Sequence, residues 1–468
     1  MAPRVLVSLV ALTASWLAGN ASAAPVVGWR MDGTGNYPSA KPPLEWSPTS
    51  HVLWSTAMPS WSNSSPILVG DKIFVASEPA TLICLSAADG KILWQRTNPI
   101  EDAVSARLAP QPFLEQQVRM DRVQRTLPEK EYQLTALRQR PRKSPAEEKL
   151  GDEARTLAKQ ATELRQELGA IAVASRPPNV NDVNGYSSAT PTSDGQSVYV
   201  FFGTGIAAAY DLEGQRRWIQ FVDRSRVADG PASSPVLTGG KVLILVNDLI
   251  ALDAATGDVA WRVNVPPRKG TPIAFRIDGE DLAILPSGHC VRAADGAIVA
   301  SGVGDLEFAS PLVQDGVIYM IQRNAQAFRI PEHLAEHLEF EPLWTALMMK
   351  GERYYSSAVL AGGLIYAATR SQILNVLDAK TGQEVYAERL RLGWTGGADS
   401  IFASLTQAGP YVYVSGVSGN TAVLQPGRSY QQLALNSLEP FRSSPVFDGD
   451  RMYVRGQSKF YCISSGSP

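Results

Sequence analysis

One four-part pattern recurs along this chain and constrains its fold more than any other feature. Its clearest copy, residues 233–261, reads SSPVLTGGKVLILVNDLIALDAATGDVAW. Two apolar runs meet at Gly239-Gly240, and two more meet at the turn that ends in Gly257. Short apolar runs separated by turn residues predict a four-stranded antiparallel sheet. Similar copies occupy residues 64–94, 189–218 and 356–386.

The first turn of each copy gives the number of copies. It falls at eight positions, which are Gly70, Gly195, Gly239, Gly279, Asp315, Gly362, Gly409 and Gly449. From Gly195 onward these turns lie 44, 40, 36, 47, 47 and 40 residues apart, which is a spacing typical of propeller blades. The sequence therefore predicts an all-β fold, an eight-bladed β-propeller.

The two ends of the chain carry the parts of one blade. The last copy stops after its third strand, which contains Cys462. Residues 51–54 have the sequence of a fourth strand with no preceding three. We therefore expect the N-terminal strand to close the last blade, because closure removes the free sheet edges of an open ring.

Most copies end on an aromatic residue, four positions after the second turn. These residues are Trp94, Trp218, Trp261 and Tyr386. The fourth copy has Ala300 at this position, and we expect Trp344 to take the aromatic role in the fifth.

An insertion separates the first two blades, because Gly70 and Gly195 are 125 residues apart. Residues 103–178 hold two stretches with apolar residues at three-four spacing around a turn at 140–145. This pattern predicts an antiparallel α-helical, coiled-coil hairpin. Its tip is basic, with Arg138, Arg140, Arg142 and Lys143. Two interpretations stay open, a solvated hairpin whose charges keep it soluble and an arm that binds a partner.

The start of the chain has the pattern of a signal peptide. Arg4 precedes an apolar run over residues 5–18, and Ala21-Ser22-Ala23 is a small-residue cleavage site. No cysteine follows this run, so we expect a periplasmic or extracellular protein that is not a lipoprotein. The predicted organisation is a signal peptide at 1–23, the closing strand and blade 1 within 24–102, the hairpin at 103–178, and blades 2–8 within 179–468.

Charge and hydropathy exclude two classes of partner. The net charge of −2 and the pI near 6.2 leave no basic footprint for nucleic acid. No segment after residue 23 is continuously apolar over the length of a membrane span. We expect a propeller that is monomeric and not anchored by a helix.

The three cysteines stand at the same position of the repeat. Cys84, Cys290 and Cys462 each fall in a third strand. Equivalent positions in different blades point into different sheet interfaces, too far apart for a disulfide. We therefore predict three separate, buried thiols.

The pattern Ala-Leu-Asp-Ala-x-Thr-Gly-x-x-x-Trp, kept best at residues 251–261, resembles the pyrroloquinoline-quinone-like (PQQ-like) propeller repeat. Quinoprotein dehydrogenases share this repeat with the propeller subunit of the outer-membrane β-barrel assembly machine. The resemblance covers residues 54–462 apart from the insertion. It implies the fold and leaves the function open, because such propellers host unrelated activities.

The resemblance also implies what a quinone enzyme would need. Quinoprotein dehydrogenases use two adjacent cysteines over the cofactor, a tryptophan beneath it, and carboxylate and amide ligands to calcium. This chain has no adjacent cysteines and no Cys-x-x-Cys-His haem motif. We therefore expect no cofactor, and the balance favours a protein that is not an enzyme.

One weak metal candidate remains. His333 and His337 form His-x-x-x-His on an expected short helical turn, where two imidazoles four apart can chelate zinc, with Glu336 and Glu341 as possible further ligands. The glutamate of the His-Glu-x-x-His motif is missing. Histidine and glutamate are also common on a solvated turn, so we predict no metal site here.

The residues before each first strand are expected to form one rim of the central channel. As binding residues we predict Trp61, Asn63, Tyr186, Asp229, Glu307, Tyr355, Asp399 and Arg442. Neighbouring positions hold Asn184, Phe308, Tyr354, Phe402 and Phe441. Aromatic rings among carboxylates, amides and an arginine suit a peptide or a sugar. The alternative is that these polar residues only hydrate a water-filled channel.

Two classes of function follow. The first is a non-catalytic exported scaffold that binds protein, peptide or glycan partners in the cell envelope through the rim and the hairpin. The second is a quinone- or metal-dependent enzyme that acts on a small exported substrate. The lack of adjacent cysteines and the presence of only four histidines favour the scaffold.

Overall fold

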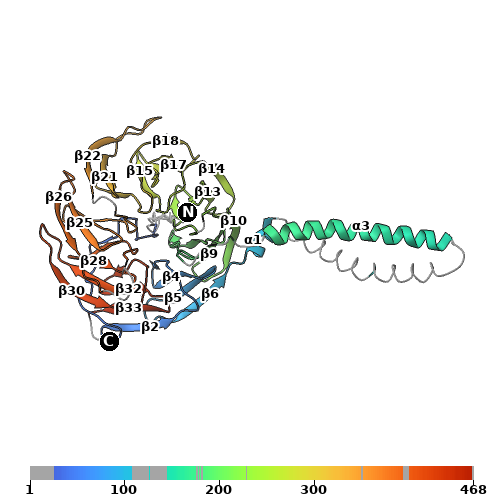
Figure 1. Cartoon of the computed structure of the whole chain (residues 1–468), viewed down its shortest axis with the longest axis horizontal. Coiled ribbons are helices and arrows are strands. Elements are labelled where there is room, and N and C mark those ends of the chain that lie inside the picture. Colours follow the sequence, from blue (N-terminus) through green and yellow to red (C-terminus); the bar gives the residue numbers. More distant parts are fainter. Residues whose placement is uncertain are drawn as a thin grey trace, which may run out of the picture.

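A computed structural model gives the architecture of residues 26–107, 126, 145–174, 178, 180, 183–227, 229–348, 352–393 and 400–465. The expected signal peptide, the basic residues Arg138, Arg140, Arg142 and Lys143, and the rim residue Asp399 lie outside these described residues. Eight antiparallel sheets stand side by side around a central axis (Figure 1). The eight-bladed propeller predicted from the repeat is confirmed.

Blades 1 to 7 each hold four consecutive strands in chain order. Blade 1 consists of β3 (Ile67–Val69), β4 (Lys72–Ser77), β5 (Thr81–Ser86) and β6 (Ile92–Thr97). Blade 2 consists of β7 (Thr192–Ser193), β8 (Ser197–Phe201), β9 (Ile206–Asp211) and β10 (Arg216–Phe221). Blade 3 consists of β11 (Val236–Thr238), β12 (Lys241–Leu245), β13 (Leu249–Asp253) and β14 (Val259–Val263). Blade 4 consists of β15 (Ile273–Ile277), β16 (Glu280–Ile284), β17 (Cys290–Arg292) and β18 (Ile298–Ala300).

The second half of the ring repeats this arrangement. Blade 5 consists of β19 (Leu312–Gln314), β20 (Val317–Met320), β21 (Asn324–Arg329) and β22 (Glu341–Leu347). Blade 6 consists of β23 (Val359–Ala361), β24 (Leu364–Ala368), β25 (Ile373–Asp378) and β26 (Glu384–Arg389). Blade 7 consists of β27 (Thr406–Ala408), β28 (Tyr411–Ser415), β29 (Asn420–Leu424) and β30 (Gln432–Ser437). The last sheet contains β31 (Val446–Asp448), β32 (Arg451–Arg455) and β33 (Lys459–Ser464).

The fourth strand of the last sheet comes from the other end of the chain. This strand, β2 (Val52–Ala57), pairs antiparallel with β33, from Ala57 opposite Lys459 to Val52 opposite Ile463. β33, the last strand of the chain, lies beside β2 (Figure 1). Leu53 and Trp54 pack on the buried cluster that contains Tyr453 and Phe460.

The aromatic residue at the end of a blade packs against the next blade. The indole N–H of Trp218 donates to the Ala254 carbonyl at 2.9 Å, and its ring covers Gly257 in the second turn of blade 3. Trp94, Trp261 and Trp344 donate in the same way to the following blade. The expectation that Trp344 takes this role in blade 5 is confirmed. These contacts hold neighbouring sheets in register around the ring.

The loop before β22 differs from its prediction. Residues 331–340 contain no helical turn, so the expected helix around His333 and His337 is wrong. The backbone N–H groups of this loop bond to blade 4 instead of to carbonyls four residues back. Leu334 N donates to Asp278 Oδ2 at 2.8 Å, and Leu338 N donates to the Val299 carbonyl at 2.8 Å.

That loop also explains why blade 4 can lack its aromatic residue. Leu338 and Phe340 pack into the apolar cluster that contains Val299 and Ala300. The larger side chains of the neighbouring loop therefore fill space beside the small Ala300.

A short helix follows blade 1 directly. Helix α1 (Ile100–Arg107) starts directly after blade 1 and packs on blade 2, where Ile100 and Ala103 contact Ile206. Arg216 of β10 forms an ion pair with Asp102 at 2.8 Å. Because Ala103 is 1% exposed, the proposed boundary at residue 103 falls inside a packed contact.

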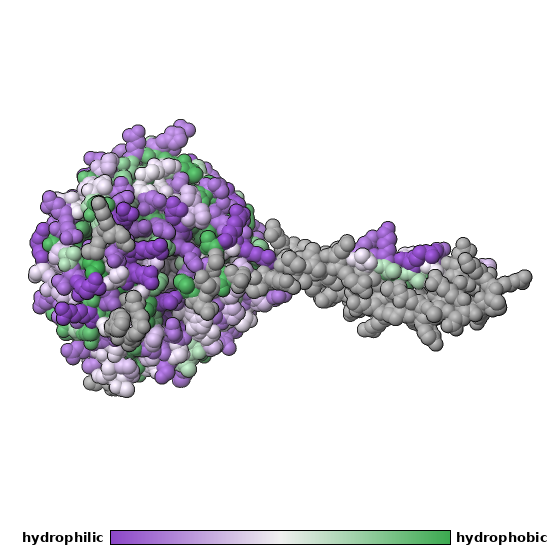
Figure 2. All heavy atoms as spheres, in the orientation of Figure 1, coloured by the Kyte–Doolittle hydropathy of each residue, from purple (hydrophilic) through white to green (hydrophobic). Residues whose placement is uncertain are grey.

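Helix α3 (Pro145–Ala174) is the long described part of the insertion and points away from the disc (Figure 1). Its 30 residues correspond to a length of about 45 Å at the rise of an α-helix. Leu150 and Leu157 are half-buried and Ala154 is buried, while hydrophilic side chains follow its outer side (Figure 2). The pairing of α3 with a second helix concerns residues outside the described ranges and stays a prediction.

The three cysteines are free and fully buried, as predicted. Burial raises the pKa of each thiol, at Cys84, Cys290 and Cys462, to about 12. These thiols are therefore protonated at neutral pH and belong to the core.

Candidate functional site at the mouth of the central channel

A closed ring of hydrogen bonds surrounds the channel axis, with one hydroxyl from each blade. Each backbone N–H donates to the serine or threonine oxygen of the next blade over 2.8–3.1 Å. In order around the ring the residues are Ser65, Thr190, Ser234, Thr271, Ser310, Ser357, Ser404 and Ser444, and Ser444 N returns to Ser65 Oγ. We call this set the hydroxyl ring.

The hydroxyl ring leaves its own hydrogens available. A hydroxyl that accepts an N–H still has one O–H to donate. Among the described residues, none of the eight oxygens donates to a protein acceptor. Seven of the eight, all except Ser234, line a cavity of about 740 Å³ on the axis. The cavity wall therefore offers hydrogen-bond donors to its contents.

The N-terminal segment crosses the axis on the far side of this ring. Val27 bridges to Ser193 of blade 2, and β1 (Asn36–Tyr37) pairs in parallel with β27 of blade 7. Between them, Trp29 lines the cavity. Arg30 is 2% exposed and bonds through Nη2 to the carbonyls of Ala358 and Leu405.

Arg30 lies directly beneath the hydroxyl ring. Ala358 and Leu405 each follow a ring serine by one residue, so the guanidinium lies one step further along the inner strands of blades 6 and 7. Burial lowers the Arg30 pKa to about 10. Trp29 thus lines the cavity, and the buried cation of the next residue, Arg30, lies behind it.

The structure brings most of the predicted rim residues together. Of the predicted binding residues, Asn63, Asp229, Glu307, Tyr355 and Arg442 line the cavity, and so do their neighbours Asn184, Phe308 and Phe402. Asp399 lies outside the described residues. These residues therefore lie together at the channel mouth. Their role in binding stays a proposal.

Other predicted rim residues point elsewhere. Tyr354 and Phe441 are fully buried in the core next to lining residues, because neighbouring side chains on an extended chain alternate between two sides. Trp61 and Tyr186 do not line the cavity and instead flank Glu78. This carboxylate accepts hydrogen bonds from the N–H groups of Tyr186 and Ser187 at 2.7 and 2.6 Å, and it lies against Gly185 beside the Trp61 ring.

Four cationic lining residues were not predicted. Besides Arg442, the cavity is lined by Arg268, Lys269, Arg353 and Arg370. Arg268, Lys269 and Arg353 stand two to four residues before a ring hydroxyl, so their place in the stretch before the first strand could have indicated them. Arg370 lies on the turn between β24 and β25, where no feature of the repeat indicates the axis.

Stacked side chains form a continuous band across blades 5 to 8. Phe308 meets Tyr355 edge-on at 4.6 Å, and Tyr355 stacks on Phe402 at 4.9 Å between ring centroids. The Arg442 guanidinium lies 4.9 Å from the Phe402 ring centre, and Arg370 lies 5.9 Å from that of Tyr355. We call these five residues the aromatic–arginine band.

Metal binding receives no support from the described residues. They contain no group of three or more histidine, cysteine, aspartate or glutamate side chains that could hold an ion. His333 and His337 are exposed, and His333 Nδ1 lies 3.5 Å from Asp278 Oδ1. No helix among the described residues is long and apolar enough to cross a membrane.

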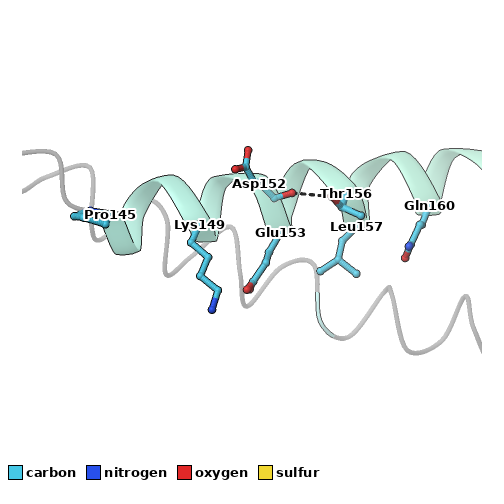
Figure 3. A pocket seen from close by; sticks show the side chains of 7 residues that line it. All are labelled: Pro145, Lys149, Asp152, Glu153, Thr156, Leu157 and Gln160. Carbon is cyan, nitrogen blue, oxygen red and sulfur yellow. Dashed lines mark hydrogen bonds between the residues drawn. The ribbon is translucent and has the colours of Figure 1, made fainter.

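A second, open groove of about 700 Å³ runs along α3. Lys149, Glu153, Leu157 and Gln160 point to one side of the helix, and Asp152 points away (Figure 3). All seven of its described lining residues belong to this single helix. The described lining of this groove therefore comes from one element, whereas the lining of the channel mouth comes from several blades.

Comparison with known proteins identifies the family of this propeller. Residues 45–140 and 230–467 match the family described as outer membrane protein assembly factor BamB. The chain belongs to this family. A curated relative, outer membrane protein assembly factor BamB of Burkholderia pseudomallei strain K96243, is 33% identical over 103 residues. This match covers 21% of the chain and a quarter of that relative.

Solved structures support the fold at low sequence identity. BamB from Moraxella catarrhalis superposes with a TM-score of 0.54 at 12% identity, over 88% of this chain and 99% of that one. A europium-containing methanol dehydrogenase superposes with a TM-score of 0.52 at 11% identity, over 91% of this chain and 88% of that one. At such identities the likeness concerns the propeller alone.

Proposed function

We propose that the chain is a non-catalytic scaffold of the cell envelope that takes part in the assembly of outer-membrane proteins. The observation that carries this proposal is the family match, which covers blades in both halves of the ring. The signal-peptide pattern at residues 1–23 supports export to the periplasm. A closed propeller then provides a rigid disc on which partner-binding surfaces are held.

Two surfaces are proposed to bind partner proteins. The first is the rim, with Trp61, Asn63, Tyr186, Asp229, Glu307, Tyr355, Asp399 and Arg442. The second is the hairpin, with α3 and the basic residues Arg138, Arg140, Arg142 and Lys143. An insertion of this length with its own helix is usually retained for function. Its projection beyond the disc suits an arm that contacts another protein (Figure 1).

Photocrosslinking in the native envelope tests the proposal. A photoreactive amino acid replaces Tyr355 on the rim or the exposed Lys159 on α3, and Glu384 on the exposed outer strand β26 serves as the control. We expect Tyr355 or Lys159 to crosslink to a defined envelope protein that Glu384 does not capture. Identical products from all three positions would contradict a specific partner surface.

A second measurement concerns the assembly role. Cells that lack the chain are expected to hold less folded outer-membrane β-barrel protein, measured by heat-modifiable migration on gels. The parent chain should restore the level, and a chain whose residues 108–177 are replaced by a Gly/Ser linker should restore it poorly. Unchanged β-barrel levels in cells without the chain would exclude an assembly role.

A further inference from the structure

The described lining of the channel mouth carries more positive than negative charge. Five cationic side chains and two carboxylates, Asp229 and Glu307, line the cavity. Arg268 is already neutralised by two hydrogen bonds to Asp305, at 2.9 and 3.1 Å, and Lys269 lies 3.8 Å from Asp229. Within the described part of the chain, Arg353, Arg370 and Arg442 form no ion pair.

Arg442 is the most constrained of these cations. It is half-buried, one Nη donates to the Val183 carbonyl at 2.6 Å, and its guanidinium carbon lies 4.9 Å from the Phe402 ring centre. Burial lowers its pKa, and no carboxylate among the described residues offsets that effect. A partly desolvated guanidinium is stabilised when an anion accepts its remaining N–H groups.

The groups below Arg442 favour the same kind of ligand. The hydroxyl ring presents O–H donors to the cavity, and the buried Arg30 lies beyond it with Nε and Nη1 free of hydrogen-bond partners among the described residues. An acceptor-rich, negatively charged group satisfies donors and cations together. A neutral amide would leave the charge of the cations unbalanced.

The aromatic–arginine band adds apolar ring atoms beside the cations. Tyr355 and Phe402 stack on each other with ring planes 21° apart and both line the cavity, so their ring edges can contact an apolar or aromatic group. A carboxylate next to such a group would meet Arg442 and the hydroxyl ring at once. An acidic peptide with neighbouring aromatic residues has this chemistry.

We propose that the channel mouth is a carboxylate-binding site that takes an acidic, aromatic peptide segment of an envelope protein. This inference rests on the proposed function, because the segment belongs to the partner that the scaffold holds. A free aromatic polycarboxylate shares the same chemistry, and the experiment separates the two sources.

Calorimetric titration of the purified full chain is the first test. The probes are an acetylated Glu-Phe-Glu-Phe-Glu amide, its analogue with glutamine in place of glutamate, and benzene-1,3,5-tricarboxylate. We expect the acidic peptide to bind once per chain, with an affinity that falls as salt rises. The glutamine analogue should bind at least about tenfold more weakly, since it loses charge-assisted hydrogen bonds.

Matched variants locate the site. Arg442→Gln should weaken binding of the acidic peptide by about 10- to 100-fold, as expected when a hydrogen bond to a charged group is lost. Phe402→Leu should weaken it less, and Arg370→Gln serves as a second arginine variant should Arg442→Gln fail to fold. Arg268→Gln is the control, because this arginine lines the same cavity while already paired with Asp305. Its affinity should stay within about twofold of the parent, and melting curves establish that each variant is folded.

Several results would overturn the inference. They are equal binding of the acidic and glutamine peptides, equal losses in Arg442→Gln and Arg268→Gln, and binding of the tricarboxylate without the peptide. Failure of this site differs from failure of the proposed function. Rim crosslinks without peptide binding would leave the scaffold standing and reject the carboxylate site. Peptide binding without any envelope crosslink would support the carboxylate site and reject the scaffold.

Discussion

At the scale of single residues, the contacts between blades depend on a few small positions that admit a large neighbour. Gly257 has a φ of +79°, and a Cβ placed there would lie 2.6 Å from a ring carbon of Trp218. Gly240 in the same blade has a φ of +68° and open space around it. The two glycines therefore separate the effect of backbone strain from that of packing.

We expect Gly257→Ala to lower the free energy of unfolding by about 2–4 kcal/mol, as the sum of a left-handed backbone strain and an overpacked indole. Gly240→Ala should cost about 1–2 kcal/mol from backbone strain alone. Denaturant unfolding followed by tryptophan fluorescence measures both. Equal losses would show that the Trp218 contact contributes little to holding blades 2 and 3 together.

The buried thiols give a second prediction at this scale. With a pKa near 12, Cys84, Cys290 and Cys462 carry almost no thiolate at pH 8. We expect no reaction with iodoacetamide in the folded protein and three alkylated residues after unfolding, counted by mass spectrometry. Rapid alkylation of the folded chain at pH 8 would contradict the raised pKa.

The same thiols predict the sign of a pH effect. Their folded-state pKa is above the unfolded value of about 8.5, so the folded state binds more protons at alkaline pH. Their contribution to stability is therefore complete below pH 8.5 and declines as the pH rises towards 12. Replacing each cysteine by alanine should flatten this alkaline decline.

At the scale of elements, the blades could be predicted because their signals are local. Turn residues and apolar runs lie within a few positions of one another, and all eight predicted first-turn residues adopt positive φ. The loop at 331–340 could not be predicted from its own pattern, because its N–H groups bond to Asp278 and Val299 in another blade. Arg370 was not predicted as a lining residue for the same reason, since its backbone N–H donates to the carbonyl of Arg353 in another loop.

The insertion gives the prediction at this scale. Replacing residues 108–177 with a Gly/Ser linker should leave the melting temperature within a few degrees, because α1 and its contact with blade 2 are retained. Extending the replacement back to residue 100 removes the buried Ile100 and Ala103 and the Arg216–Asp102 ion pair. Loss of a buried isoleucine costs about 2–5 kcal/mol, so this longer replacement should melt lower in calorimetry. Equal melting of both would mean that α1 does not stabilise the disc.

At the scale of the whole molecule, the ring and the channel depend on segments that are far apart in the sequence. The repeat allowed the number of blades to be predicted, since each blade carries its own turn. The hydroxyl ring was missed, although a serine or threonine precedes the first strand in every blade, because its hydrogen bonds become visible only when eight blades meet around one axis. The position of the N-terminal segment could not be predicted either, because nothing in the sequence of residues 26–37 indicates contact with blades 2, 6 and 7.

The last prediction concerns the contribution of β2 to the closed ring. A variant that starts at residue 58 loses Leu53 and Trp54 from a buried cluster and leaves β33 with an unpaired edge. We expect this variant to melt lower by roughly 10 °C or more, as for a loss of several kcal/mol. Light scattering should also show association, because open strand edges recruit other chains. A variant that starts at residue 35 is the control, since it loses Trp29 and Arg30 from the channel and keeps β2. If both variants stayed monomeric with the melting temperature of the parent, the pairing of β2 with β33 would not be what holds the ring closed.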